Sequence, residues 1–253
     1  MFDLTGRTAL VTGAGQNIGA GIARALGAAG ATVLVNDLRS ERAEEVVEAL
    51  LADSHAAVAV AFDVTDRAAI DAAVAESGPI DVLVNNAAVI ERTPLLDMTV
   101  EAWDTVIRTD LTGVFVMTQP VVRRMIGRGG GKVINVCSMM SELGRDSVGA
   151  YAAAKGGLKM LTRSMATEWA RHGIQVNGIG PGYFATEQTA PIREPGHPFN
   201  EWIVSRTPAG RWGDPDDLAG AAVFLASAAS DFVNGHVLYV DGGILATIGR
   251  PQA

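Results

Sequence analysis

The chain has 253 residues, of which 48% are hydrophobic, and it carries a formal net charge of −8 with a pI near 5.0. This length allows one large domain with a substantial core, and the composition argues against an intrinsically disordered chain. The acidic balance argues against a general surface for nucleic acids or anionic membranes. We therefore expect neither a nucleic acid nor a membrane as a partner.

The cysteine and histidine content and the N-terminal residues limit the possible disulfides, metal sites and cellular locations. Cys137 is the single cysteine, so no intrachain disulfide can form, which fits a reducing compartment. The four histidines are scattered without metal-ligand spacing, so no metal site is predicted. The start "MFDLTGRTALVTG" lacks the features of a signal peptide, and no run reaches the roughly 18 apolar residues of a membrane span. A cytoplasmic location is the expectation.

Short β-rich apolar runs alternate with longer helical segments along the chain. The predicted strands are 8–12, 32–36, 57–62, 81–85, 132–136, 174–179 and 236–240. Ser40, Asp66 and Thr99 are residues that favour helix N-termini, and each precedes or opens a helical segment. Strands that are apolar on both faces and alternate with helices indicate a parallel sheet covered on both sides. The predicted fold class is α/β: a Rossmann-type, doubly wound, seven-stranded parallel sheet in a single domain, 1–253.

The first predicted strand runs into the glycine-rich stretch "TGAGQNIG" (12–19), and an Ala-rich helical segment follows. A strand–turn–helix of this kind points backbone N–H groups and a positive helix end at a pyrophosphate. Gly13 permits the tight turn, and Gly19 permits close approach of the helix to the sheet. Asn17 stands where one more glycine is expected, but asparagine tolerates left-handed backbone. A packing turn without a ligand is the alternative.

Acidic residues end the second and third predicted strands. Asp37 lies near the ~20-residue separation expected for an acid that binds the ribose hydroxyls of a dinucleotide. A carboxylate there repels a 2′-phosphate, which favours NAD, whereas Arg39 can offset that repulsion and leaves NADP open. Asp63 and Val64 can border the adenine, although Asp63 can equally be a helix cap.

The segment "YAAAK" puts Tyr151 and Lys155 four residues apart, on one face of a helix. Ser138 follows the predicted strand 132–136 directly. Because a doubly wound sheet binds ligands at the carboxyl ends of its strands, Ser138 is expected beside the cofactor.

With these motifs, the chain resembles the short-chain dehydrogenase/reductase family over its whole length. The matching motifs are "TGAGQNIG", "DV" at 63–64, "NNAA" at 85–88, Ser138, "YAAAK", "PGYFAT" at 181–186 and "VDGG" at 240–243. Ala88 stands where the family usually has glycine. The cofactor-binding residues predicted from the motifs and the resemblance are Gly13, Gln16, Asn17, Ile18, Gly19, Asp37, Asp63, Val64, Asn86, Ala87, Tyr151, Lys155, Pro181, Gly182 and Thr186.

The predicted chemistry is hydride transfer with proton exchange. A phenol is a poor base near neutrality because its pKa is about 10, and a cation about 4 Å away supplies roughly the energy needed to favour the phenolate. Lys155 is that cation and also holds the nicotinamide ribose. Tyr151 would exchange the proton with the alcohol or ketone, and Ser138 would hydrogen-bond the substrate oxygen.

One position departs from the family. The segment "WDTVIRTDLTGVF" matches the helix whose asparagine usually completes a Ser–Tyr–Lys–Asn tetrad, and here that residue is Asp110. Its charge would partly cancel the field of Lys155 on Tyr151, so we expect a more alkaline oxidation optimum than in an Asp110→Asn variant. The alternative is a substitution tolerated because a water mediates the contact.

Signals for the substrate are weaker. Arg92 and Arg145 suit a carboxylate, because the guanidinium fork matches its geometry. Ser141 and Glu142 could bond sugar hydroxyls, whereas in the alternative Glu142 and Arg145 pair with each other or face solvent. The irregular stretch 181–199 predicts a substrate loop over about 183–209, in which Tyr183 and its neighbours either close over the substrate or pack. The predicted substrate-binding residues are Arg92, Ser138, Glu142, Arg145 and Tyr183.

Stretches such as "VINVCSMMSELGRD" and "SDFVNGHVLYVDGG" are similar to the gluconate 5-dehydrogenase (5-keto-D-gluconate reductase) subgroup. That resemblance implies a small-molecule substrate, a sugar acid or polyol, and NAD or NADP as cofactor. Family likeness also implies a homotetramer in which the helical segments 99–126 and 148–172 pair across subunits.

Two alternatives remain. A 3-oxoacyl-carrier-protein reductase of the same fold would favour NADPH and need a basic patch, which Asp37 and the acidic pI disfavour. A non-catalytic NAD-binding protein is disfavoured by the intact Ser138, Tyr151 and Lys155.

Overall fold

The computed structural model describes residues 1–249 apart from the side chain of Gln188, so residues 250–253 of the predicted domain lie outside the described residues. Its centre is a seven-stranded, all-parallel sheet in the order β3-β2-β1-β4-β5-β6-β7, which confirms the predicted fold class. The strands are β1 (Thr8–Val11), β2 (Thr32–Val35), β3 (Ala57–Ala59), β4 (Val82–Asn85), β5 (Gly131–Val136), β6 (Ile174–Pro181) and β7 (Val237–Val240).

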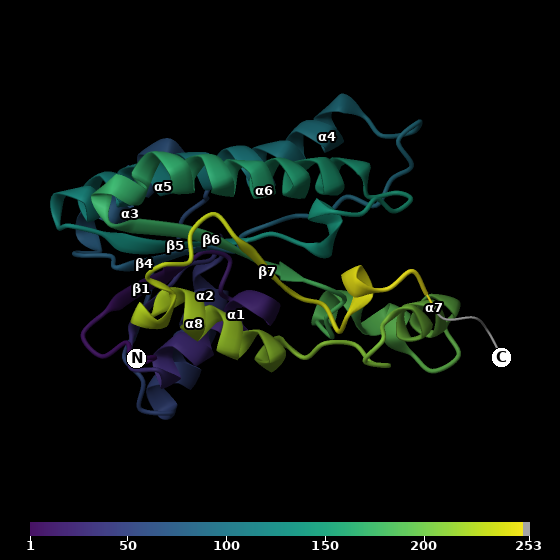
Figure 1. The fold of residues 1–253 in the computed structure, drawn as a ribbon, viewed down its shortest axis with the longest axis horizontal. Helices are drawn as coiled ribbons and strands as arrows, with labels where there is room; N and C mark the ends of the chain where they lie inside the picture. Colours follow the sequence, from purple (N-terminus) through teal and green to yellow (C-terminus); the bar gives the residue numbers. More distant parts are fainter. Residues whose placement is uncertain (250–253) are drawn as a thin grey trace.

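Helices cover both faces of the sheet (Figure 1). One layer holds α1 (Asn17–Ala28), α2 (Ser40–Ala52) and α8 (Ala219–Ala226), and the other holds α3 (Arg67–Glu76), α5 (Gly113–Gly127) and α6 (Gly149–Trp169), with α4 (Val100–Ile107) packed on α6. Successive residues of a strand point their side chains to opposite faces of the sheet. Ala9 and Val11 pack in the core under α1 and α8, whereas Leu10 packs in the core under α5 and α6. This alternation is why the strands are apolar on both faces.

Two strands differ from their predicted ranges by more than one residue, because of their pairing. The third strand ends at Ala59 rather than at residue 62, since β3 is an edge strand and only the residues opposite Val33–Val35 of β2 form a ladder. Conversely, β6 runs on to Pro181, since β7 pairs with it to that point. The predicted caps hold for Asp66 and Thr99, whose side chains accept backbone N–H groups, whereas Ser40 opens α2 without a capping bond.

The predicted substrate loop is folded into two short helices. It contains the 3₁₀ helix η4 (Glu187–Arg193) and α7 (Pro198–Arg206), which projects beyond the sheet (Figure 1). An aromatic cluster anchors it: the Tyr183 ring lies 5.9 Å from Phe199, 6.3 Å from Trp202 and 5.7 Å from Trp212, all edge-on. Edge-to-face contacts at such spacings are favourable, so packing holds α7 in place. We call residues 183–209 the lid.

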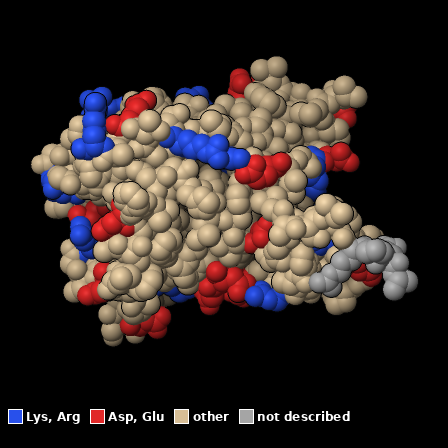
Figure 2. Space-filling model, viewed as in Figure 1, with Lys and Arg blue, Asp and Glu red and all other residues tan. Residues whose placement is uncertain are grey.

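The surface shown in Figure 2 carries acidic and basic side chains scattered around a broad uncharged area. Lysine and arginine do not gather into one patch on this face. Among the described residues, no helix combines the length and the apolar character needed to cross a membrane.

Candidate active site

A cavity of about 810 Å³ opens at the carboxyl ends of β1, β4, β5 and β6, where the strand order reverses. A doubly wound sheet binds ligands at this point. The predicted residues that line it are Gly13, Gln16, Asn17, Ile18, Gly19, Asp37, Asp63, Val64, Asn86, Ala87, Arg92, Ser138, Arg145, Tyr151, Lys155, Pro181, Gly182, Tyr183 and Thr186. Two predicted site residues, Asp110 and Glu142, do not line it.

The glycine-rich turn has the backbone that the sequence requires. Gly13 (φ +59°) and Asn17 (φ +52°) are both left-handed, which confirms the expectation for Asn17. A Cβ on Gly13 would lie 2.8 Å from Ala87 Cα, and one on Gly19 would lie 2.4 Å from the Gly13 carbonyl oxygen. Both contacts are too short for any side chain, so these glycines let the turn and α1 approach the sheet closely.

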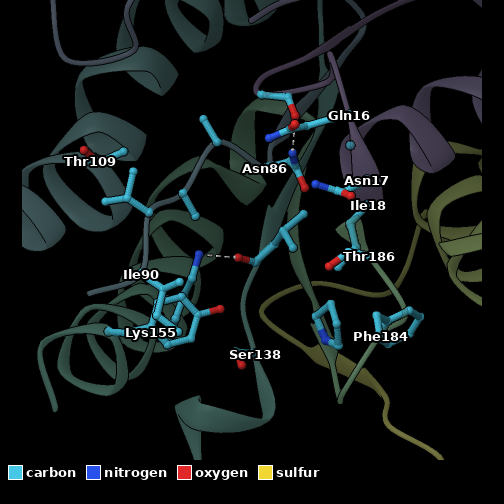
Figure 3. Close-up of a pocket in the computed structure, with 18 of the residues that line it drawn as sticks. Gln16, Asn17, Ile18, Asn86, Ile90, Thr109, Ser138, Lys155, Phe184 and Thr186 are labelled. Atoms are coloured by element: carbon cyan, nitrogen blue, oxygen red, sulfur yellow. Dashed lines mark hydrogen bonds between the residues drawn. The ribbon is translucent and has the colours of Figure 1, made fainter. Parts of the chain in front are cut away.

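Asn86 braces this turn from the neighbouring strand. Its Nδ2 donates to the carbonyl oxygens of Thr12 and Gly13, each at 2.9 Å, and Figure 3 draws the bond to Gly13. The Thr12 hydroxyl accepts the N–H groups of Asn86 and Ala87 in return. Ala88 does not adopt positive φ, so alanine fits where the family has glycine without backbone strain.

These features fit a dinucleotide. The turn leaves space against α1 that only glycine permits, and the N-terminus of α1 presents backbone N–H groups and the positive end of the helix dipole to the cavity. No acidic side chain lies in the first turn of α1 to oppose an anion there. Asp37 closes the other end of the cavity, where its carboxylate accepts the N–H groups of Gly15 (3.2 Å) and Arg39 (3.1 Å).

Three side chains with catalytic potential meet at the opposite end. Ser138 is buried, its Oγ accepts the Met140 N–H at 3.1 Å, and its own proton is donated to no group among the described residues. Tyr151 and Lys155 come from successive turns of α6, with Lys155 Nζ 5.5 Å from the centre of the Tyr151 ring. Ser138 can therefore donate to a ligand oxygen in the cavity that Tyr151 also lines. Figure 3 shows Ser138 and Lys155 at this end of the cavity.

Lys155 is almost wholly buried, and the structure fixes its ammonium from two sides. Nζ donates to the Val136 carbonyl oxygen at 2.9 Å, the bond drawn in Figure 3, and lies 3.6 Å from Asp110 Oδ2. Burial acts to lower the pKa of Lys155, but the attraction of Asp110, Tyr151 and Cys137 outweighs it and leaves the pKa above its usual value. The amine is therefore held as a cation next to Tyr151.

Asp110 lies behind Lys155 rather than in the cavity wall. It sits in a five-residue π-helical turn, Arg108–Thr112, between α4 and α5, a local geometry that is frequent at functional sites. Its Oδ1 accepts the Val89 N–H at 2.8 Å, whereas the buried Oδ2 has no hydrogen-bond partner within residues 1–249. Burial raises the pKa of Asp110, and the nearby Lys155 ammonium and the Val89 N–H oppose that rise.

Glu142 is not where the sequence analysis put it. Its Oε1 accepts the Tyr239 hydroxyl at 2.6 Å and the Lys159 ammonium at 2.5 Å, and this pairing, with Lys159 as the largest cause, lowers the pKa of Glu142. It neither lines the cavity nor pairs with Arg145, so the predicted substrate contact has no geometric support. Its partners Lys159 and Tyr239 lie on α6 and β7, and nothing in the sequence around Glu142 indicated these contacts.

The lid side of the cavity holds buried polar atoms without partners. Tyr183 Oη and Arg145 Nε are both buried and form no hydrogen bond among the described residues. The Arg145 guanidinium lies 5.2 Å from the centre of the Phe199 ring. Burial raises the pKa of Tyr183, and the positive charges of Arg145, Arg206 and Arg92 oppose the rise. The positive charges of three arginines therefore act on an unsatisfied hydroxyl at this end.

A family model described as enoyl-(acyl carrier protein) reductase matches residues 13–245. A 2-dehydro-3-deoxy-D-gluconate 5-dehydrogenase of Formosa agariphila is 59% identical over 100% of this chain and 97% of its own length. The chain belongs to the short-chain dehydrogenase/reductase family. A 5-keto-D-gluconate 5-reductase of Escherichia coli is 53% identical over 98% of this chain and 99% of its own. The crystal structure of a gluconate 5-dehydrogenase from Burkholderia cenocepacia, in complex with NADP and tartrate, is 47% identical with a TM-score of 0.93 and covers 98% of each chain.

Membership of the short-chain dehydrogenase/reductase family makes this chain an oxidoreductase that uses a nicotinamide cofactor and acts on CH–OH groups. The residues that most distinguish it from the family pattern are Asn17, Ala88 and Asp110. Two of the three are accommodated locally, Asn17 by its left-handed backbone and Ala88 by its ordinary one. Asp110 changes the charge next to Lys155.

Other residues of the cavity wall were not predicted as site residues, although Ala88 and Phe184 lie in quoted motifs. They are Asn36, Leu38, Arg42, Phe62, Thr65, Ala88, Val89, Ile90, Thr105, Arg108, Thr109, Val136, Cys137, Met139, Met140, Val148, Phe184, Thr189, Ile192 and Phe199. Those directly next to a motif, such as Val89 and Ile90 after "NNAA", were within reach of the sequence. Thr105, Arg108 and Thr109 gave no signal, because only the packing of α4 and its π-helical turn brings them to the cavity.

Proposed function

We propose that this enzyme transfers a hydride between NADP and the secondary alcohol or ketone of a sugar acid such as gluconate or 5-ketogluconate. The observation that carries the substrate class is the pair of buried, unpartnered polar atoms on the lid side, Arg145 Nε and Tyr183 Oη, with Arg92 and Arg206 near them. A carboxylate would satisfy both atoms, and a buried polar atom left unpaired costs about 1–3 kcal/mol. The names of the curated relatives support the same class.

The catalytic roles follow from the geometry at the other end of the cavity. A bound nicotinamide supplies or accepts the hydride. In the oxidation direction Tyr151 takes the hydroxyl proton, and in reduction it returns that proton to the forming alkoxide. Ser138 donates its free proton to the reacting oxygen and fixes it beside Tyr151. Lys155 supplies the positive field, and Asp110 holds Lys155 through their buried contact.

We propose NADP as the preferred cofactor, which differs from the preference that Asp37 suggested in the sequence. Both oxygens of the Asp37 carboxylate accept a backbone N–H, from Gly15 and Arg39, and so are less available to ribose hydroxyls. Arg42 lines the same end and supplies a cation for a 2′-phosphate. The relative from Burkholderia cenocepacia was crystallised with NADP.

The test is absorbance at 340 nm with NADP or NAD and substrates that differ in the carboxylate. D-Gluconate, and 5-keto-D-gluconate in reverse, are compared with D-glucitol, which keeps the hydroxyls but has no acid group. We expect at least tenfold higher kcat/KM for the acid, an advantage that Arg145→Met removes and the remote, exposed Arg171→Met retains. Turnover that Tyr151→Phe does not abolish, or equal rates with D-glucitol, would contradict the proposal.

We further propose a cytoplasmic homotetramer. Large apolar side chains are exposed on the helices expected to pair, namely Val100 and Trp103 on α4, Phe115 on α5 and Met160 on α6. Light scattering coupled to size exclusion tests the state: four chains of 26.3 kDa each are expected, and a monomer would refute it.

A further inference from the structure

Asn17 joins two parts of the cavity wall that lie far apart in the sequence. Its side-chain Oδ1 accepts the backbone N–H of Glu187 at 3.0 Å, across 170 positions of the chain. Asn17 belongs to the glycine-rich turn that faces the expected pyrophosphate, whereas Glu187 is the first residue of η4 in the lid. Figure 3 draws Asn17 and Ile18 close to Thr186, the residue before Glu187.

The rest of this part of the lid is held by its own bonds. Thr186 and Thr189 form a reciprocal capping box at the start of η4, and the Arg193 guanidinium donates to Thr189 Oγ1 and to the Thr186 carbonyl oxygen, each at 3.2 Å. Of the hydrogen bonds formed by the described atoms of residues 186–197, the one to Asn17 alone reaches outside the lid. It therefore ties a self-contained unit to the phosphate-binding turn.

The side chain of Asn17 is not needed for the turn itself. Its backbone is left-handed (φ +52°), a conformation that glycine adopts at no steric cost. Glycine at this position would keep the turn and lose only the acceptor for Glu187. The asparagine thus adds a contact that a glycine-only loop lacks.

We propose that Asn17 is a positioning residue that couples cofactor binding to closure of the lid over the substrate. A pyrophosphate bound at the N-terminus of α1 orders residues 16–18, which holds Oδ1 in place for the Glu187 N–H and fixes η4. Thr186 and Ile192, which line the cavity, are then held in its wall. Because coupling is reciprocal, a closed lid also strengthens cofactor binding. The coupling to substrate rests on the proposed function, but the coupling to cofactor does not.

The first test is limited trypsin cleavage after Arg193 in the full-length protein, with and without saturating NADP, followed by mass analysis of the fragments. Asn17→Gly keeps the backbone and removes the acceptor, whereas Asn17→Asp keeps an acceptor oxygen. One hydrogen bond corresponds to about three- to tenfold in an equilibrium. We expect Asn17→Gly to be cut about three- to tenfold faster than wild type and to lose the protection that NADP gives wild type.

The Asp variant separates the acceptor from other causes. Without cofactor, Asn17→Asp is expected to be cut as slowly as wild type, although its charge next to the pyrophosphate should weaken NADP binding. Equal cleavage of wild type and Asn17→Gly with NADP present, or fast cleavage of Asn17→Asp without it, would overturn the proposal.

Steady-state kinetics give the second readout. In Asn17→Gly we expect the KM for the carbonyl or alcohol substrate to rise about three- to tenfold, with a smaller change in kcat. A fall confined to kcat would contradict a positioning role. The cleavage assay needs no substrate, so it tests the coupling even where gluconate and 5-ketogluconate are not turned over, and failure of the sugar-acid assignment stays distinguishable.

Discussion

The Lys155 ammonium lies 3.6 Å from Asp110 Oδ2, and both side chains are almost completely shielded from water. In this low-dielectric setting the carboxylate acts strongly on the lysine and reduces the positive field that reaches Tyr151. The geometry also shows a direct approach of the two side chains, which favours direct interaction over the water-mediated alternative.

Replacing Asp110 by asparagine removes that opposing charge while keeping the shape and an acceptor for the Val89 N–H. The Tyr151 phenolate is then favoured at lower pH, so the optimum for alcohol oxidation should move to a more acidic value. A pH profile of kcat in the oxidation direction measures the shift. The same optimum in both proteins would mean that the Asp110 charge does not reach the phenol.

Gly19 is the least replaceable glycine of the phosphate-binding turn. A Cβ there would lie 2.4 Å from the Gly13 carbonyl oxygen and 2.5 Å from Asn86 Nδ2, so Gly19→Ala forces α1 away from the sheet. We expect a loss of about 1–3 kcal/mol in the free energy of unfolding and at least tenfold weaker NADP binding. Urea unfolding and fluorescence titration measure the two.

The matched control is Gly220→Ala in α8, where an added Cβ meets nothing within 4 Å. There the higher helix propensity of alanine should leave stability unchanged or raise it by up to about 1 kcal/mol. Equal losses in both variants would show that the close approach at Gly19 is not the cause.

Arg42 is expected to decide between the two cofactors. It lines the cavity near Asp37, whereas Arg39, the residue that the sequence suggested, does not. Arg42→Ala should lower kcat/KM for NADP about tenfold and leave that for NAD nearly unchanged, because only NADP carries the 2′-phosphate. Arg39→Ala is the comparison, with a smaller expected loss. A larger loss for Arg39→Ala would reassign the contact.

Arg211 and Asp217 form an exposed two-point ion pair just beyond the lid, with N–O distances of 2.6 and 2.9 Å. The Arg211 hydrogen bonds, helped by the Asp214 N–H, lower the pKa of Asp217 to about 2. An acid whose pKa is lowered by folding stabilises the protein above its unfolded pKa, near 4, and that contribution disappears as the pH falls through about 2.

Arg211→Ala should therefore reduce the free energy of unfolding at pH 6, and the difference from wild type should shrink between about pH 4 and pH 2. Urea unfolding across this range gives the profile, and Asp217→Asn should reproduce it. A difference that stays constant with pH would exclude the Asp217 charge as its source.

Much of the fold was predictable because it depends on local patterns. The seven apolar runs became the seven strands, since most of them are buried on both faces and the alternating helices leave only a parallel arrangement. The edge strand β3 is the exception, with Val58 half exposed. The strand ends were less predictable at Ala59 and Pro181, because pairing with β2 and β7 sets them.

The site also contains residues that the sequence predicts and contacts that it does not. The glycine turn, Ser138, Tyr151 and Lys155 follow strand ends or share a helix face, so short-range sequence determined both their presence and their meeting point. The left-handed backbone of Asn17 could be predicted because asparagine tolerates that conformation and stands at a glycine position of the motif. Contacts between distant segments could not be predicted from local sequence. The bonds of Glu142 to Lys159 and Tyr239 form only in the folded chain, and so does the bond between Asn17 and Glu187. The sequence determined the chemistry, through residue types at fixed spacing, whereas the tertiary structure decided the partners, because side-chain contacts depend on how the layers and the lid pack.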